Sequence, residues 1–568
     1  MIVGIDLGTT NSAVAVWRDG QSHLIPNALG EYLTPSAVSI VDGDTILVGA
    51  AAKERQSTHP RDTATVFKRY IGTSQTTRLG RMEFGAEDLS ALILRSLKDD
   101  AEAFLGEPVT GAVITVPAYF NDRQRKATRR AGELAGLKVE RLINEPTAAA
   151  LAFGVHERAE REPFLVFDLG GGTFDVSIVE MFDGIVEVRA SAGNNRLGGE
   201  DFNDCLIDLA RRRIDPDGCL DGADPIALRE LLRVSAERAR RELSDRDNAV
   251  FSLTHDDTVF SATIGSAEFE SHAETLMAQL RDPVLRSLRD SGIASEALSE
   301  IVLVGGATRM PIVRRAITRM FGRFPNASVH PDHAVALGAA VQAGLLARDA
   351  ALDEIRLTDI CPFTLGVDQA ERDMRGNLRY GLFSPIIERN SPIPISRVNY
   401  YCTIGDGQSA IQFGIYQGEA RDVSANVKLG ELKIPVPPRP AGQISVECRF
   451  SYDSSGLLEV DVLVPATGLK RNLVIIDDAD AMTPDEVERR RESLAALKFH
   501  PREDARNAAL LARAKRCYEG FIGENRERVG QWITTFEAAL DSQDDRLIRD
   551  AQAELARVLD ALEGERFL

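Results

Sequence analysis

Two copies of one short motif limit what this chain can fold into. Residues 4–12 read GIDLGTTNS, and residues 166–175 read VFDLGGGTFD. In each copy an apolar strand ends in an aspartate, a turn rich in glycine and threonine follows, and a second strand begins at Ala13–Trp17 or Val176–Val179. One copy alone is as typical of an ordinary hairpin as of a phosphate-binding turn. The two copies together favour two loops that grip one polyphosphate and its metal ion, through N–H groups that glycine exposes.

The composition narrows the class of protein. A chain of 568 residues suggests three or four domains, and 44% hydrophobic with 27% charged residues is typical of a soluble globular protein. The net charge of −19 argues against nucleic acid as a partner. The first residues form a strand rather than a signal peptide, and no apolar run is long enough for a membrane, so we expect a cytoplasmic protein with no membrane partner. The spacing of the six cysteines predicts reduced, mostly buried thiols and no zinc site.

The hydrophobic period divides the chain. From residue 1 to 352, strand-like and helical stretches alternate, which predicts an α/β domain within a multidomain protein. Between 360 and 475 the period changes to two, as in Leu458–Val464, which predicts an antiparallel β-sandwich. From 476 to 568 the pattern is helical: a capping box at 483–486 precedes the helically spaced apolar residues Val529, Ile533, Phe536 and Leu540.

Residues 353–359 join the first two parts. The segment is acidic at both ends and apolar in the middle. A solvated linker has no need of Ile355 and Leu357, so we expect them to dock on one domain in one state and to be released in another. A plain connector or a short edge strand is the alternative.

Three further segments complete a nucleotide-site pattern. Residues 142–150 (LINEPTAAA) begin a small-residue helix at Glu145, whose simplest role is to face the helix dipole. Residues 301–309 (IVLVGGATR) run from a strand into a double-glycine turn that lets backbone approach a flat base, and 332–346 form an alanine-rich helix. With the two loops, these segments stand in the order that an actin-like ATPase needs.

Phosphoryl transfer to water requires carboxylates for Mg²⁺, donors for the phosphate oxygens, and a cation near the attacking water. Asp6, Asp168 and Asp175 supply the carboxylates. The donors are Thr9, Thr10, Thr173 and the loop glycines. The pattern alone does not select the cation among the many lysines and arginines. It places Lys68 on a solvated helix face.

These segments, with residues 115–125 (TVPAYFNDRQR) and 302–311 (VLVGGATRMP), resemble the heat shock protein 70 (Hsp70) chaperone family over nearly the whole chain. Residues 195–202, 383–390 and 451–464, with a short tail-less lid, are most similar to the bacterial HscC branch. The resemblance implies an actin-like ATPase domain of duplicated ribonuclease H-like halves at 1–352, a linker at 353–359, a β-sandwich peptide-binding domain at 360–475 and an α-helical lid at 476–568. It implies an ATP-dependent chaperone for extended hydrophobic segments of unfolded proteins.

The same resemblance assigns the site. Lys68 becomes the cation that orients the attacking water, Asp6, Asp168 and Asp175 surround Mg²⁺ and K⁺ mostly through water, and Glu145 joins the metal shell. The remaining contacts to ATP or ADP fall on Gly8, Thr9, Thr10, Asn11, Gly170, Gly171, Gly172, Thr173, Gly198, Gly199, Glu237, Arg240, Arg241, Ser244, Gly305, Gly306, Arg309 and Asp332.

Further residues are assigned outside the cleft. The resemblance makes Pro117 and Arg125 a relay to the peptide domain, Arg141 a contact for J-domain co-chaperones, and Ile355, Leu357 and Asp359 the allosteric linker. It puts a peptide groove at Leu365, Val367, Tyr401, Ile404, Ile411 and Phe413. From the residues alone, these six would be sandwich core.

The chain departs from the family pattern at several points. Arg240 stands for the usual lysine and Ala307 for serine, which bears on nucleoside affinity but not on ATP binding. The stretch between Tyr70 and Leu89 is short, so nucleotide is expected to escape faster and the need for an exchange factor stays open. Arg356 interrupts the apolar run of the linker, which predicts weaker coupling.

Two other functions fit the ATPase pattern. A sugar or metabolite kinase would need a polar substrate pocket and would leave about 200 C-terminal residues without a role. An actin-like filament protein would polymerise with ATP, and the β module and lid argue against it.

Overall fold

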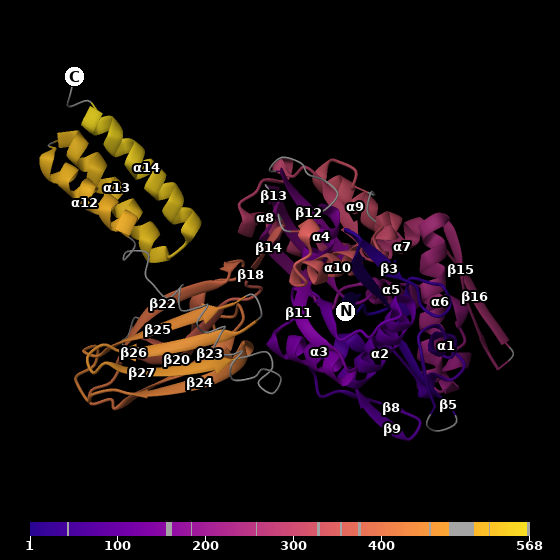
Figure 1. Ribbon diagram of the computed structural model, residues 1–568. Coiled ribbons are helices and arrows are strands. Elements are labelled where there is room, and N and C mark those ends of the chain that lie inside the picture. The colour runs from indigo at the N-terminus through magenta and orange to yellow at the C-terminus, as the bar shows by residue number, and fades with distance from the viewer. Residues whose placement is uncertain are drawn as a thin grey trace. The chain divides into compact units, whose positions relative to one another are not determined.

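The computed structural model describes residues 1–41, 45–154, 162–182, 184–256, 258–326, 330–352, 355–372, 377–453, 456–475, 505–521 and 523–564. The chain forms two compact units, the first comprising Met1–Phe363 with Arg389–Pro392 and the second Thr364–Glu388 with Ile393–Leu568. Figure 1 follows the chain through both units. The predicted capping box at 483–486 and the beginning of the predicted lid lie outside the described residues.

The first unit contains two large sheets built on one plan. The first has the order β11 (Lys138–Asn144), β10 (Gly111–Val116), β1 (Ile2–Asp6), β2 (Asn11–Arg18) and β3 (Gln21–Ile25), with β4 (Thr34–Pro35) paired to β2. Strands β1, β10 and β11 are parallel, whereas β1, β2 and β3 form an antiparallel meander.

The second sheet repeats this arrangement. Its strands are β17 (Ile301–Val304), β12 (Glu162–Leu169), β13 (Phe174–Phe182), β14 (Ile185–Asn194) and β18 (Arg356–Ile360), in that order. Strands β12, β13 and β14 form the meander, and β17 runs parallel to β12 as β10 does to β1. The two loops predicted from the repeat are therefore the β1–β2 and β12–β13 turns.

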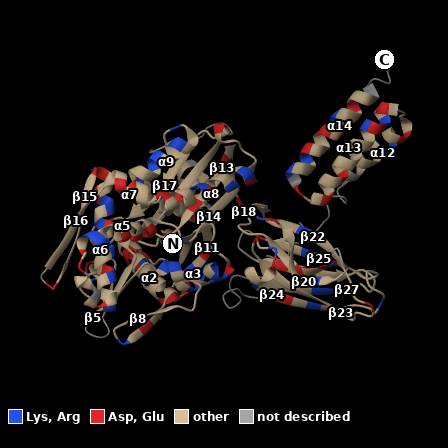
Figure 2. Cartoon of the chain, turned by 180° about the vertical axis from the view of Figure 1, so that it is seen from behind, with Lys and Arg blue, Asp and Glu red and all other residues tan. Residues whose placement is uncertain are grey.

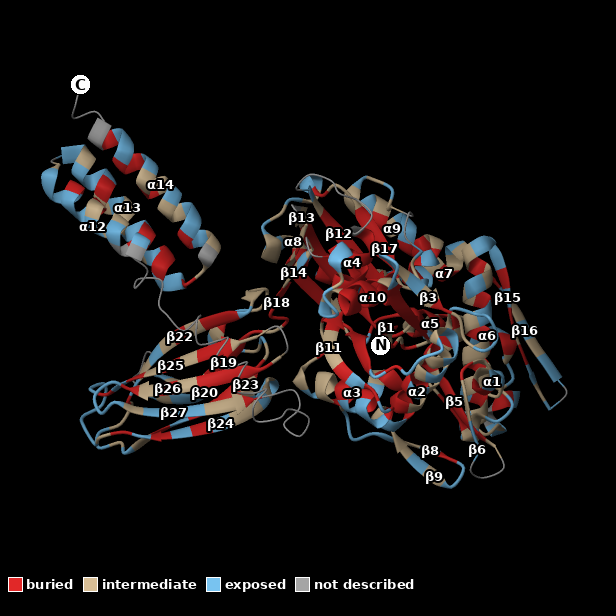
Figure 3. Ribbon diagram, in the orientation of Figure 1, coloured by how far each residue is buried: buried red, intermediate tan, exposed pale blue. Residues whose placement is uncertain are grey.

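Two helices of small residues pack between these sheets. Helix α10 (Ala334–Leu346) lies on β1 and β2, while α4 (Glu145–Gly154) lies on β12 and β13. A Cβ built on Gly338 of α10 would stand 1.7 Å from the carbonyl oxygen of Ala148 in α4, so the helices touch backbone to backbone. Figure 3 shows this region as the most continuously buried part of the unit. The predicted alanine-rich helices thus form the core that joins the two sheets.

The outer faces of the sheets are covered by longer helices. Helices α2 (Ala86–Leu105) and α3 (Asp122–Leu134) cover the first sheet, and α8 (Glu274–Ser291) packs on β13 and β14. The rest of this side consists of α5 (Gly199–Ile214), α6 (Pro225–Asp245), α7 (Ser266–His272), α9 (Pro311–Phe321) and the hairpin β15 (Asn248–His255) and β16 (Thr258–Gly265). Coverage on both faces explains why β10 and β17 are buried at every position.

A small outer region completes the first unit. It holds the sheet of β5 (Ala37–Val41), β6 (Thr45–Val48) and β7 (Thr63–Thr65), helix α1 (Ala50–Glu54), the 3₁₀ turn Phe67–Tyr70 and the hairpin β8 (Thr76–Leu79) and β9 (Met82–Gly85). The stretch between Tyr70 and Leu89, short in the sequence, is little more than this hairpin.

The second unit begins with two antiparallel sheets of four strands. One has the order β20 (Leu378–Ile387), β19 (Leu365–Arg372), β23 (Ala410–Gln417) and β24 (Val427–Pro435). The other has β22 (Ile395–Cys402), β25 (Ser445–Tyr452), β26 (Leu458–Val464) and β27 (Leu469–Ile475). The short β21 (Pro392–Ile393) lies where the units meet in the sequence. The predicted change to a period of two is confirmed, since buried residues alternate along β25.

In the part of this unit that the structure describes, three helices follow: α12 (Ala505–Gly520), α13 (Gly523–Ser542) and α14 (Asp545–Gly564). Val529, Phe536 and Leu540 of α13 are fully buried among them, and Ile533 packs against the same cluster, as the helical spacing predicts. Charges of both signs are spread over these helices (Figure 2). Among the described helices of the whole chain, none is long and apolar enough to cross a membrane.

The described cysteines are all free thiols. Cys361, Cys448 and Cys517 are buried, but Cys219 and Cys402 are exposed and Cys205 is intermediate, so the expectation that most are buried holds for only half of them. No described group of three or more His, Cys, Asp or Glu side chains converges as a metal site would.

Candidate functional site

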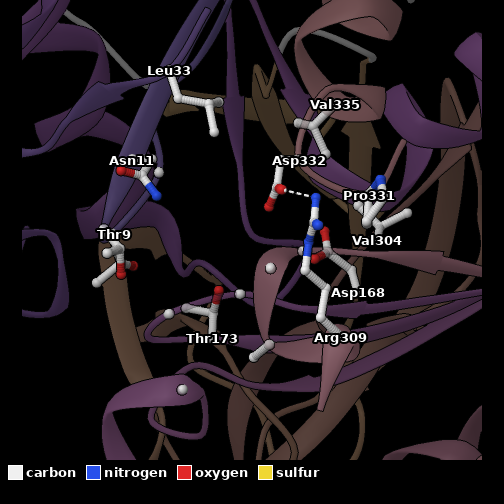
Figure 4. A pocket seen from close by; sticks show the side chains of 18 of the residues that line it. Thr9, Asn11, Leu33, Asp168, Thr173, Val304, Arg309, Pro331, Asp332 and Val335 are labelled. Carbon is white, nitrogen blue, oxygen red and sulfur yellow. Dashed lines mark hydrogen bonds and ion pairs between the residues drawn. The ribbon is translucent and has the colours of Figure 1, made fainter. Parts of the chain in front are cut away.

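A cavity of about 800 Å³ lies between the two glycine loops of the first unit (Figure 4). Most residues predicted for the nucleotide line it: Asp6, Gly8, Thr9, Thr10, Asn11, Lys68, Glu145, Asp168, Gly170, Gly171, Thr173, Gly199, Glu237, Arg240, Arg241, Ser244, Gly305, Gly306, Arg309 and Asp332. Gly172, Gly198 and Asp175 are the exceptions, and they lie just behind the lining. Sequence segments more than 300 residues apart thus meet around one space.

The two loops face each other across this cavity. Asp6, the last residue of β1, pairs with Ala13, and Asp168, one residue before the end of β12, pairs with Asp175, so the two aspartates take equivalent positions of their meanders. A Cβ built on Gly171 would stand 1.9 Å from the hydroxyl oxygen of Thr10 in the other loop. No side chain fits there, and glycine is required for the loops to approach. The opposed N–H and hydroxyl groups form a cradle suited to phosphate oxygens.

Four carboxyl groups, three of them buried and that of Asp6 half-buried, interact with one ammonium at the centre of the site. Lys68 Nζ donates a 2.7 Å hydrogen bond to Glu145 Oε1, and both side chains are buried. Burial and the charge of Glu145 raise the pKa of Asp6 to about 7 and that of Asp175 to about 8, and they raise the pKa of Asp168 well above its usual range. The charge of Lys68 lowers the pKa of all three aspartates but does not offset these two effects. The cluster therefore holds more acidic groups than the ammonium of Lys68 can keep ionised.

The donor set fits a bound cation. Oδ2 of Asp168 and Oδ1 of Asp175 are buried without a hydrogen-bond partner, as expected of oxygens that await a cation or its water ligands. The described acidic side chains do not converge on one point, so direct coordination by three of them is not built in. Water-mediated contacts suit this spacing better, because Mg²⁺ keeps several of its waters.

Lys68 corrects one prediction made from the pattern alone. It lies in the 3₁₀ turn Phe67–Tyr70 and is 2% exposed, so it is not a solvated lysine. Its ammonium lies 5.6 Å from the ring centre of Phe120, which closes the site on that side. Sequence reasoning also missed the neighbouring Arg69, which forms an ion pair with Asp201 next to the second loop.

The other end of the cavity is built from α6 and the 305–309 turn. Burial opposes ionisation of Glu237, but Lys53 at 3.1 Å and Arg241 outweigh it and lower its pKa to about 2. Arg240 donates to Asn203 Oδ1 at 2.8 Å, which orients its guanidinium. Arg309 pairs with Asp332, as the dashed line in Figure 4 shows. Charged and flat groups thus gather where a base and a ribose would lie.

Several residues that line the cavity were not predicted. They are Leu33, Asp245, Val304, Arg314, His330, Pro331 and Val335. Val304 and Val335 lie within predicted segments, and Asp245 and Pro331 adjoin the predicted Ser244 and Asp332. Leu33, Arg314 and His330 come from loops and helix faces that the sequence alone does not bring to the site.

The predicted linker is a strand. Residues Arg356–Ile360 form β18, which pairs in parallel with β14, Leu357 lying opposite Val186. Ile355 and Leu357 pack against the core around α4 and α10. The described backbone is thus a short strand between β14 and β21 rather than an edge strand, and its apolar side chains dock on one domain.

A chain of hydrogen bonds runs from the carboxylate cluster to β18. The N–H of Ala118 donates to Asp175 Oδ2 at 3.3 Å, and Arg125 donates to Phe120 O at 3.1 Å and to Asn144 Oδ1 at 2.5 Å.

The last link of this chain reaches the linker strand. The amide of Asn144 lies 3.4 Å from both carboxylate oxygens of Asp359. Burial raises the pKa of Asp359, while the Ile360 N–H and the charges of Arg141 and Arg125 hold it down. Pro117, Arg125, Arg141 and Asp359, predicted far apart in the chain, lie along one path, and buried Pro117 accepts from the Phe120 N–H at 3.1 Å.

The predicted peptide residues lie in the sheets of the second unit. Leu365 and Val367 of β19 share a face with Ile411 and Phe413 of β23, and all four are buried. The ring of Tyr401 in β22 lies edge to face with Phe413 at 5.3 Å. Ile404, in the loop after β22, is half-buried. The structure thus places five of the six in one part of the sandwich, in an environment that is also that of a sandwich core.

Comparison with known proteins agrees with this geometry. A family profile described as Hsp70 protein matches residues 2–79 and 73–566. The chain is 41% identical over 499 residues to the chaperone protein DnaK of Thermotoga petrophila, covering 86% of this chain and 82% of that protein. It is 42% identical over 485 residues to DnaK of Thermotoga neapolitana, covering 84% and 80%. Over 611 aligned positions it is 37% identical to DnaK 1 of a Synechococcus strain, covering 99% and 80%.

The family profile spans nearly the whole chain, and the matched relatives align with 84% or more of it. The site, the two-sheet plan and these similarities agree, and the chain belongs to the Hsp70 family.

Proposed function

We propose that ATP bound between the two glycine loops controls a peptide groove in residues 360–475 through the linker strand β18. As an Hsp70 protein the chain is an ATP-dependent molecular chaperone: it binds ATP and ADP, hydrolyses ATP, and binds unfolded client polypeptides. The proposal concerns which residues perform each step. The observation that carries it is the buried Lys68–Glu145 pair among unpartnered carboxylate oxygens between the opposed loops.

In this mechanism the chain positions ATP and a water molecule. Thr9, Thr10 and Thr173 donate hydroxyl hydrogens to the terminal phosphates, with the loop N–H groups beside them. Lys68, fixed by Glu145, holds the attacking water in line with the terminal phosphate. Asp6, Asp168 and Asp175 would hold hydrated Mg²⁺, together with K⁺, and these ions supply neutralisation of phosphate charge when bound.

The linker would transmit a change of the bound nucleotide to the peptide groove. The hydrogen-bond path through Arg125 and Asn144 to Asp359 supports this role, because it joins the carboxylate cluster to β18. ATP can shift such a switch only if it favours the docked strand over the released one. The docked β18 would open the groove, and its release after hydrolysis would close the helical region over an extended apolar segment.

The groove itself is assigned to Leu365, Val367, Tyr401, Ile404, Ile411 and Phe413. An extended segment would bind through its backbone, with one apolar side chain in a central pocket. The proposed domains are the ATPase domain at 1–352, built of duplicated ribonuclease H-like halves on an actin-like plan, the linker at 353–359, the β-sandwich at 360–475 and the lid at 476–568.

The proposal also covers the co-chaperone, nucleotide exchange, the location and the subfamily. A J-domain co-chaperone would contact Arg141. The need for a nucleotide exchange factor stays open. The cytoplasm is the proposed location, and the HscC branch is the proposed subfamily, on the sequence segments 195–202, 383–390 and 451–464.

Steady-state ATPase measurements with and without a short apolar peptide test the coupling. Peptide should stimulate the wild type, whereas Val367→Phe and Ile411→Phe should keep the basal rate and lose the stimulation. Val259→Phe, at a 67% exposed position of the first unit, is the matched control. An ATPase rate of the wild type that does not change with peptide would show that the ATPase is not coupled to the β module. It would refute the proposal.

A further inference from the structure

The turn His330–His333 lies at the end of the cavity beside Arg309, and its two histidines have no role in the mechanism above. The N–H of Gly305 donates to Pro331 O at 2.9 Å, and the N–H of His333 donates to His330 O at 3.0 Å. These bonds fix the turn to the 305–309 segment just before α10 begins. His330, Pro331 and Asp332 line the cavity, so the turn is part of its wall.

A single nitrogen of Arg309, Nη2, lies within hydrogen-bond distance of two acceptors. Its Nη2 lies 3.2 Å from Nε2 of His330 and also donates to Oδ2 of Asp332. A guanidinium has donors only, so His330 Nε2 must accept, and the imidazole is neutral with its proton on Nδ1. The two hydrogens of Nη2 are then both used, and the plane of the guanidinium is fixed at the cavity wall.

The acceptor histidine is itself held by stacking. The rings of His330 and His333 are 3.8 Å apart at 21°, and Tyr32 meets the other side of His333 edge on at 6.0 Å. Burial, His330 and Arg309 lower the pKa of His333, and Asp332 opposes them. The charged and titratable groups that face this pair are therefore Arg309, Asp332 and Tyr32.

We propose that His330 is a positioning residue for the nucleotide: its neutral Nε2 holds Arg309 against the base, and protonation of His330 weakens nucleotide binding. This inference rests on the proposed function, in which Arg309 contacts the adenosine.

The physical consequence of protonation follows from the contacts. A proton on Nε2 removes the acceptor and sets a second positive charge beside Arg309, where it competes for Asp332. The Arg309 side chain is 47% exposed, so little other packing keeps it in place.

Equilibrium binding of a fluorescent ADP analogue to the full-length chain tests this, at roughly pH 8 and at roughly pH 5.5, a range over which histidine side chains can change charge. His330→Gln keeps an acceptor that does not titrate, His330→Ala removes it, and His255→Gln in the β15 strand is the control. The phosphate of the nucleotide also changes charge over this pH range. It does so equally with the wild type and with His330→Gln, so the difference between the two proteins excludes this effect.

The wild type and the control should bind about fivefold more weakly at the lower pH than His330→Gln does, the factor that one ordinary hydrogen bond provides. At the higher pH, His330→Gln should match the wild type and His330→Ala should bind about fivefold more weakly, with KM raised and kcat unchanged. Unchanged binding by His330→Ala, or an equal loss on acidification in His330→Gln, would overturn the inference. A wild type that binds no nucleotide at either pH would instead refute the proposed function.

Discussion

Replacing Lys68 by methionine removes the ammonium that interacts with these four carboxyl groups and keeps the volume of its side chain. The hydrogen bond from Lys68 Nζ to Glu145 is 2.7 Å long and both groups are buried, so Glu145 loses its partner without gaining water. Breaking a buried pair in this way costs about 3–5 kcal/mol of stability. We expect a loss near the lower end, because Asp6 and Asp175 can take up protons once Lys68 no longer lowers their pKa.

The effect on hydrolysis should be larger than the effect on binding. Loss of one preorganised charged donor raises a reaction barrier by about 3–4 kcal/mol, which is roughly a 10²- to 10³-fold loss of rate. ATP affinity should stay within about threefold, since the loops and the 305–309 turn are untouched.

Single-turnover hydrolysis and equilibrium ATP binding measure the two quantities separately. Lys98→Met is the matched control, because Lys98 of α2 does not line the cavity; its ammonium forms a long 3.9 Å pair with Glu102 and donates to Gly136 O at 3.2 Å. Hydrolysis near the wild-type rate in Lys68→Met would remove Lys68 from the mechanism and refute the reasoning from its burial.

Three more predictions concern the carboxylates, the loop contact and the linker. The folded-state pKa values of Asp6 and Asp175, about 7 and about 8, lie above the unfolded value, so their stabilisation is present at low pH and is lost as pH rises through them. The nucleotide-free chain should therefore lose roughly 2–4 kcal/mol of stability between pH 6 and pH 9, read from Trp17 fluorescence during urea unfolding. Gly171→Ala should abolish ATP binding measured by calorimetry, because its Cβ would meet a hydroxyl oxygen at 1.9 Å. Asp359→Ala should reduce peptide stimulation of the ATPase at least about fivefold, because the linker strand loses its buried hydrogen bonds.

Each of the three predictions has a control variant and a result that would contradict it. Trp532→Phe leaves Trp17 as the only tryptophan, and stability that rises with pH would contradict the carboxylate argument. Gly222→Ala adds a Cβ that meets nothing within 4 Å, and Asp349→Ala removes a carboxylate whose side chain caps only the exposed Ala351 N–H. Intact ATP binding by Gly171→Ala, or full peptide stimulation of Asp359→Ala, would show that the contact in question is not needed.

Much of the nucleotide site follows from the sequence because it depends on local rules. A strand that ends in aspartate before glycine and threonine predicts a turn with free N–H groups, and the repeat predicts two of them facing one ligand. The alanine-rich helices were predictable in the same way. Their contact, in which Gly338 admits the carbonyl of Ala148, explains why both must consist of small residues.

Lys68 was not predictable from local pattern, because its burial is a tertiary property. Phe67-Lys68-Arg69-Tyr70 reads as a polar surface turn, and only the approach of Glu145, 77 residues away, makes the lysine part of the site. His330 shows the same limit. Nothing in His-Pro-Asp-His points to Arg309, and the contact exists because the 305 turn binds the Pro331 carbonyl.

The linker shows a third limit. Its apolar residues indicated docking, but whether it would form a strand depended on the free edge of β14, which the sequence of the linker does not contain.

The rate at which a labelled apolar peptide leaves the full-length chain, measured in ATP and in ADP, tests the central claim most directly. If the cleft controls the groove through β18, release should be about tenfold or more faster in ATP, since a coupling of 1.4 kcal/mol already gives that factor. Equal release rates with both nucleotides would contradict the account.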